Sequence, residues 1–111
     1  MKRLLTIIFA ILISLALIDI NPVLAVNLSN GAKIFSVQCA GCHPNGGNIV
    51  RRGQNLRLRN LRRHKLDSVE TLAYLIANGK NNMSGFKDRL STLEIQELSA
   101  YVLERAEKGW R

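Results

Sequence analysis

Apolar residues recur at intervals of three and four over most of the chain beyond residue 26, which is the spacing of one helix face. The first helix predicted by this pattern spans about residues 28–40, with Asn27 or Ser29 as its N-cap. No convincing run of alternating apolar and polar positions, the mark of a half-buried strand, is found in the sequence. We therefore expect an all-α fold with long loops.

Two further predicted helices carry signals at both ends. The second begins at Asp67, whose carboxylate can cap free amides, and Glu70 completes a pair that resembles a capping box. Gly79 ends this helix by taking the left-handed conformation. The third helix begins at Ser91, again with a glutamate three residues later, and stops at Gly109.

The segments between these helices, residues 44–66 and 80–90, are rich in glycine and asparagine. Both are longer than ordinary helix connections, which hold about 2 to 8 residues. A small domain can order loops of this length only around something else. The pattern therefore predicts a buried group in addition to the side-chain core.

The N-terminus has the pattern of a secretory signal peptide. Lys2 and Arg3 precede an uncharged apolar run over residues 4–18, and Val23-Leu24-Ala25 offers small residues for cleavage after Ala25. The alternative is an uncleaved membrane anchor, which needs roughly 20 apolar residues. Polar residues and a proline within residues 19–22 interrupt the run too early for that.

We therefore expect residues 1–25 to be a cleaved signal peptide and residues 26–111 to form one domain. This domain has 86 residues, with 14 Lys and Arg against 7 Asp and Glu. A side-chain core is marginal at this size, and a disulfide, a metal or a large cofactor often completes it.

One motif carries recognisable chemistry. The run Cys39-Ala40-Gly41-Cys42-His43 is the C-x-x-C-H pattern of c-type haem attachment. Residues i, i+3 and i+4 share a face of one helical turn. Both thiols can therefore reach the two vinyl groups at one edge of a porphyrin as thioethers, and His43 can point at the iron. We expect one covalent haem c.

Other uses of the two cysteines are a thioredoxin-like redox pair, a disulfide or half of a zinc site. A thioredoxin fold requires βαβ units, which the sequence does not predict. A tetrahedral zinc site would have to combine Cys39, Cys42 and His43 with His64, an unusual spacing.

Electron transfer favours a second axial ligand, because a saturated iron changes oxidation state with little rearrangement. Met83 is the only methionine beyond residue 25 and lies 40 residues after His43. A methionine and histidine pair raises the potential of c-type haems. His64 is the competing ligand and would lower the potential, but it lies in a solvated cationic run, residues 62–65.

The sequence resembles the class I c-type cytochromes, most closely cytochrome c6 of cyanobacteria and algal plastids, over nearly all of residues 26–111. The matching segments are Gly31-Ala32-Lys33-Ile34-Phe35, Cys39-Ala40-Gly41-Cys42-His43, Gly46-Gly47-Asn48, Asn78-Gly79-Lys80 ahead of Met83, Ala100-Tyr101-Val102-Leu103 and Glu107-Lys108-Gly109-Trp110.

This resemblance implies a cytochrome c fold, in which N- and C-terminal helices cross near Gly31, Phe35 and Tyr101 over a haem wrapped by loops. It also implies a monomeric single-electron carrier and not an enzyme. The expected route is from the cytochrome b6f complex to photosystem I or a terminal oxidase, in the thylakoid lumen or the periplasm.

Three positions depart from the family's pattern. Leu75 stands where the family tends to have glutamine close to the haem, and Met83-Ser84-Gly85 replaces a Met-Pro-Ala run. Arg52 stands where the family often has a proline whose carbonyl accepts the proton on Nδ1 of the ligand histidine. We expect a lower reduction potential than that of a typical member.

A basic run of seven cations within fifteen residues contains no acid, and typical members lack so dense a run. It comprises Arg51, Arg52, Arg57, Arg59, Arg62, Arg63 and Lys65. Export argues against nucleic acid as a partner. The two remaining interpretations are a solvated loop face and a surface that steers the protein toward an acidic partner.

Two other functions compete with the main carrier role. The first is an auxiliary carrier of lower potential outside the main photosynthetic route. The second is a small haem enzyme or sensor with an open iron site, which requires that Met83 does not bind iron.

Overall fold

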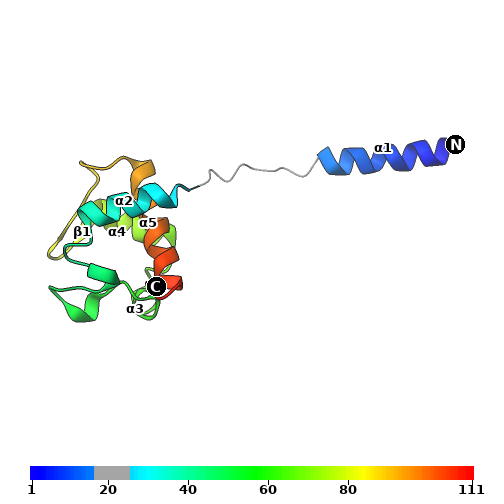
Figure 1. The fold of residues 1–111 in the computed structure, drawn as a ribbon. Helices are drawn as coiled ribbons and strands as arrows, with labels where there is room; N and C mark the ends of the chain where they lie inside the picture. The colour runs from blue at the N-terminus through cyan, green and yellow to red at the C-terminus, as the bar shows by residue number, and fades with distance from the viewer. Residues whose placement is uncertain (17–25) are drawn as a thin grey trace.

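The computed structural model describes residues 1–16 and 26–111, and helices dominate both parts (Figure 1). The α-helices are α1 (Lys2–Ala16), α2 (Leu28–Gln38), α3 (Leu58–Arg63), α4 (Val69–Asn78) and α5 (Thr92–Glu107). The short elements are the 3-10 turns η1 (Pro44–Gly46) and η2 (Arg52–Gln54) and the strands β1 (Gly79–Lys80) and β2 (Met83–Ser84).

The crossing of α2 and α5 organises the fold (Figure 1). A Cβ atom added at Gly31 would lie 2.8 Å from Cβ of Tyr101 and closer still to the carbonyl oxygen of Glu97. Only glycine lets the two backbones approach this closely. The Phe35 and Tyr101 rings, 5.5 Å apart between centroids, pack beside this contact. The crossing predicted near these residues is confirmed.

Most helix ends agree with the sequence, since Asn27 caps α2, Gly79 ends α4 and Ser91 caps α5, and two differ. The Ser91 hydroxyl accepts from the amide of Glu94, whose carboxylate accepts from the Ser91 amide, so the predicted capping box is present. The second helix is capped by Ser68, not by Asp67. The first helix ends at Gln38, two residues earlier than predicted, with Cys39 as its C-cap.

The start of α4 follows from which residues are buried. Leu72 and Ile76 are the buried residues of this helix and fix its rotation. In that register the Ser68 backbone is extended, and its hydroxyl accepts from the Thr71 amide at 3.2 Å. The Asp67 side chain is exposed instead.

The two predicted loops contain short elements that the sequence analysis missed. Helix α3 lies within residues 44–66, and its Leu61 is buried where α3 contacts α5. Residues 80–90 hold part of an antiparallel hairpin, in which Gly79 pairs with Ser84 and Lys80 with Met83. These elements are too short for a periodic pattern to reveal them. The fold class is all-α apart from this hairpin.

The core joins α2, α3, α4 and α5. Its buried members are Ile34, Phe35, Leu61, Leu72, Ile76, Phe86, Ile95, Leu98, Val102, Ala106 and Trp110. In α1, by contrast, the apolar side chains up to Ile13 are exposed. Within residues 1–16 and 26–111, no helix combines the length and hydropathy that crossing a membrane requires. The predicted cleavage site after Ala25 lies outside the described residues.

Candidate functional site

The cysteine motif continues α2 as one further turn. The Cys39 carbonyl oxygen accepts from the Cys42 amide at 3.2 Å and from the His43 amide at 2.8 Å. These are the bonds of a helical turn, so residues 39, 42 and 43 occupy neighbouring positions on one face. The local geometry that the motif predicts is present.

The His43 ring is oriented by a hydrogen bond from Nδ1, the ring nitrogen that is not expected to bind the iron. Its Nδ1 lies 2.8 Å from the Gly47 carbonyl oxygen. Because a carbonyl only accepts, Nδ1 carries the proton, and Nε2 keeps its lone pair available for a metal. Gly47 is held in turn by its amide, which donates to the Pro44 carbonyl at 2.9 Å. Gly47 therefore provides the carbonyl that accepts from Nδ1 of His43, a role that the resemblance implies for the position of Arg52.

The two cysteines are free thiols in different environments. Cys42 is exposed, and Cys39 is half-buried against the core. Burial raises the pKa of the Cys39 thiol to about 11, and the neighbouring Cys42 adds to the rise. Such a thiol is protonated at neutral pH, while thiols used in disulfide exchange have lowered pKa values. This environment opposes the thioredoxin-like alternative.

Met83 is half-buried in strand β2 and packs against the core. The hairpin turn at Asn81, with φ of 53°, brings the chain back along the end of α4. Two glycines make close contacts here, since a Cβ at Gly79 would lie 2.6 Å from the Gly85 amide nitrogen. The thioether side chain is therefore carried by a tightly folded backbone.

His64 is exposed at the C-terminal end of α3, where it is the C-cap residue. Its Nδ1 donates to the Asn60 carbonyl at 3.0 Å. In the part of the chain that the structure describes, no three His, Cys, Asp or Glu side chains come together as a metal site. The zinc alternative that combines His64 with the cysteine motif is not supported.

These donors fit a covalently attached haem. One turn presents two unpaired thiols and an imidazole with a fixed tautomer, and a second segment presents a half-buried thioether. Thiols suit thioether attachment, and histidine with methionine is an axial pair of c-type haems. The fit rests on the chemistry of the donors and on the geometry of the turn.

The basic run forms an exposed surface on η2, α3 and the turns beside them. All seven predicted cations are exposed, and none forms an ion pair within residues 1–16 and 26–111. Arg52 and Arg57 also line a hollow of about 400 Å³, together with Gly47 and Ile49. The cationic surface therefore begins next to the turn that holds His43.

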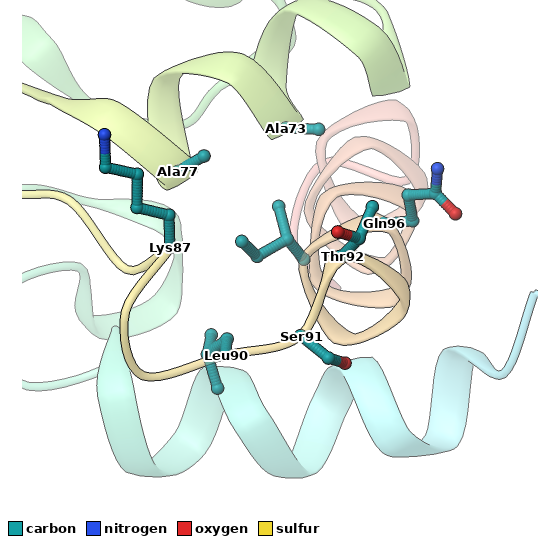
Figure 2. A pocket seen from close by; sticks show the side chains of 8 residues that line it. Ala73, Ala77, Lys87, Leu90, Ser91, Thr92 and Gln96 are labelled. Carbon is teal, nitrogen blue, oxygen red and sulfur yellow. The ribbon is translucent and has the colours of Figure 1, made fainter.

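A second hollow, of about 500 Å³, lies between α4, α5 and the segment that joins them (Figure 2). The Ala73, Ala77, Leu90 and Ile95 side chains form its apolar part, and Lys87 lies at one side. Its lining contains no cysteine, histidine or methionine, so it is separate from the candidate haem donors.

Comparisons with known proteins place this geometry in a family. Residues 26–102 match the family model described as cytochrome C oxidase, cbb3-type, subunit III. The chain is 59% identical to a cytochrome c6-like protein of Nostoc sp. (strain PCC 7120) over 90 residues, 81% of each chain. It is 39% identical to cytochrome c6 of Synechococcus sp. (strain PCC 6312), over 99% of this chain and 98% of that one. The chain belongs to the class I c-type cytochromes and is a relative of cytochrome c6.

A solved structure supports the same assignment. Cytochrome c6C from Synechococcus sp. PCC 7002 superposes with a TM-score of 0.70 at 52% identity, over 71% of this chain and 96% of that one. The cytochrome c fold predicted from the sequence is thus confirmed, with one covalently bound haem c. Members of the cytochrome c6 family are electron carriers, and this chain shares their fold and cofactor.

The sequence analysis missed two contacts at this site. One is the acceptor role of Gly47, and the other is the contact of Trp110 with the turn around Gly46. The Gly46-Gly47 pair next to the motif was the only local sign, because glycine allows close approach. Nothing local indicates which carbonyl the imidazole reaches.

Proposed function

We propose that this protein carries single electrons between redox partners, with Cys39 and Cys42 as the thioether attachments and His43 and Met83 as the axial ligands. The observation that carries the proposal is the hydrogen bond from Nδ1 of His43 to the Gly47 carbonyl, 2.8 Å long, within a closed C-x-x-C-H turn. That bond fixes the tautomer that a metal-binding imidazole needs.

When bound, haem c supplies a one-electron ferric and ferrous couple. The protein's part is to hold His43 and Met83 in fixed positions, so that few atoms move when the charge changes. Cys39 and Met83 both pack against the core, which helps to fix the two segments that carry the proposed ligands. No residue at this site is proposed to act as a general acid, a general base or a nucleophile.

The proposed partners are acidic redox proteins: the cytochrome b6f complex as donor, and photosystem I or a terminal oxidase as acceptor. The exposed cations, which form no ion pair in the described residues, support this, because complementary charge mainly raises the rate of encounter.

We also propose that residues 1–25 are a cleaved signal peptide. Residues 26–111 then act as a monomer in the thylakoid lumen or periplasm. They bind no nucleic acid and do not insert stably into a membrane.

A second candidate function is an auxiliary carrier of lower potential outside the main photosynthetic route. Two observations favour it. Identity is higher to a cytochrome c6-like protein and to cytochrome c6C, 59% and 52%, than to the cytochrome c6 of Synechococcus, 39%. In addition, Leu75 stands where the resemblance places a glutamine.

The test is to express the full precursor together with a haem-ligation system and to titrate the exported protein electrochemically. A pyridine haemochrome spectrum of thioether-linked haem, with the weak far-red band of ferric iron bound to methionine sulfur, is expected. Loss of that band in Met83→Ala, with retention in His64→Ala, would identify the ligand. Carbon monoxide binding by the unaltered protein would contradict the closed site and favour an enzyme or sensor.

The docking surface has a separate test with a matched control. Changing Arg62 and Arg63 to glutamine should slow electron transfer with an acidic partner at low salt by about tenfold, and the difference should shrink as salt screens the charges. Lys108→Gln, which removes a cation that is paired with Glu104, should change the rate much less. Equal effects of both changes would show that the basic run is a solvated face and not a docking surface.

A further inference from the structure

Trp110 lies beyond α5 and is turned back onto the domain. Gly109 and Trp110 both have positive φ, 68° and 62°, and the Trp110 amide donates to the Arg105 carbonyl at 2.7 Å. A left-handed conformation is unusual for a bulky residue and persists only where its surroundings hold it. Trp110 as a whole residue is 7% exposed, so burial of the indole accounts for this backbone.

The indole joins the helix crossing to the segments around the cysteine motif. The centroid of its ring lies 5.2 Å from the ring centroid of Phe35 in α2 and 6.4 Å from that of Tyr101 in α5. Its Nε1 donates to the Leu56 carbonyl at 2.9 Å. A Cβ added at Gly46 would lie 2.5 Å from Cγ of Trp110, so the indole packs directly on the Gly46 backbone.

Gly46 is in turn hydrogen-bonded to His43 through its amide and to Leu56 through its carbonyl. Its amide donates to the His43 carbonyl at 3.1 Å, and its carbonyl accepts from the Leu56 amide at 2.8 Å. The next residue, Gly47, accepts from Nδ1 of His43. Trp110 therefore packs on Gly46 and donates a hydrogen bond to Leu56. Gly46 and Leu56 are also joined to each other by a backbone hydrogen bond, and Gly46 directly precedes Gly47, whose carbonyl accepts from His43.

We propose that Trp110 is a positioning residue for His43: by clamping the Gly46 and Leu56 backbones it fixes the Gly47 carbonyl, and so sets the orientation and basicity of the imidazole. This inference rests on the proposed role of His43 as the axial ligand. Hydrogen bonds to the far nitrogen of a ligating histidine orient the ring and raise its donor strength.

The experiment uses the holoprotein and compares Trp110→Phe and Trp110→Ala with the unaltered chain. The direct readout is hydrogen exchange at Nδ1 of His43, followed by NMR, together with the reduction potential. In Trp110→Ala we expect exchange about tenfold faster, the change that loss of one net hydrogen bond gives. The potential should rise, because a less basic imidazole stabilises ferric iron less. Trp110→Phe, which keeps a ring without the Nε1 donor, should lie between the two.

The matched control is Tyr101→Leu. Tyr101 belongs to the same aromatic cluster, where it pairs with Phe35 and Trp110 and packs on Gly31, but the hydrogen bond to Leu56 comes from Trp110. The Tyr101→Leu variant should lower the melting temperature as much as Trp110→Phe does. It should leave hydrogen exchange at Nδ1 of His43 and the reduction potential unchanged. If Tyr101→Leu moves both readouts as far as Trp110→Phe, the role of Trp110 is merely structural and the inference is overturned.

The same data separate this inference from the proposed function. If the unaltered holoprotein shows no Nδ1 proton of an iron-bound histidine, His43 is not the ligand and both fail. If that proton is present but responds to neither Trp110 variant, the proposed function stands and only the positioning role is lost.

Discussion

The two proposed axial ligands are held by different kinds of structure. His43 follows the crossing of α2 and α5, where Gly31 lets the backbones meet and where Phe35, Tyr101 and Trp110 pack together. Met83 lies in a hairpin of two-residue strands at the end of α4. The first region is stabilised by side chains from distant parts of the chain, and the second mainly by its own backbone.

This difference indicates separate tasks. A ligand fixed by long-range packing moves only when much of the domain moves, so the His43 side provides the constant part of the site. The Met83 side depends on short-range backbone bonds, such as those from the Phe86 amide to Ile76 and from the Lys87 amide to Ala77. Changes there can alter the bond to sulfur without unfolding the domain.

The largest expected effect comes from Gly31→Ala. The added methyl group would overlap the Glu97 carbonyl oxygen and crowd Tyr101, so α2 and α5 must separate. We expect the free energy of unfolding to fall by about 3 kcal/mol, at the upper end of what overpacking costs. Chemical denaturation of the holoprotein measures this. The far-red band of the Met83 sulfur should remain as long as the protein is folded.

Gly53→Ala is the control for that substitution. Gly53 has no atom within 4 Å of an added Cβ and no positive φ, so its replacement should change stability by less than about 0.5 kcal/mol. A loss at Gly31 no larger than at Gly53 would show that the crossing can relax, and the contrast between the two regions would fail.

Gly85→Ala tests the other region and should cost less. Its methyl group would lie 2.5 Å from the Ala77 carbonyl oxygen and 2.7 Å from the Asn78 carbonyl carbon, so the segment after Met83 must move away from α4. We expect stability to fall by about 1 to 2 kcal/mol. The far-red band should weaken, in contrast with Gly31→Ala. An unchanged band with a large loss of stability would show that the hairpin does not set the Met83 position.

How far the sequence predicted these regions depends on the range of the interactions. The close approach at Gly31 was implied by the resemblance to the class I c-type cytochromes and not by a local pattern. The capping box of Ser91, by contrast, was predictable, because it follows from the chemistry of a few neighbouring residues. The C-x-x-C-H turn was predictable for the same reason. Each of these signals is local, and so the pattern alone could carry it.

The failures concern choices that tertiary structure makes. Asp67 and Ser68 can both cap a helix, and burial of Leu72 and Ile76 decides in favour of Ser68. The contact between Trp110 and Leu56 joins residues 54 positions apart, which no local pattern encodes. Helix α3 and the Met83 hairpin are too short to show a period, so they were hidden within expected loops.

The smallest change in stability, and the most specific change in potential, is expected for Leu75→Gln. Leu75 is half-buried on α4 but is not among the side chains packed on the core cluster of the described chain, so a polar replacement should cost less than about 0.5 kcal/mol. A glutamine amide presents N–H donors that favour the reduced state, so we expect the potential to rise. Tyr74→Gln places the same group on an exposed position of the same helix and should leave the potential unchanged. Equal shifts in the two variants would show that Leu75 has no special place beside the haem, and the expectation of a lower potential would then rest on the Met83 hairpin alone.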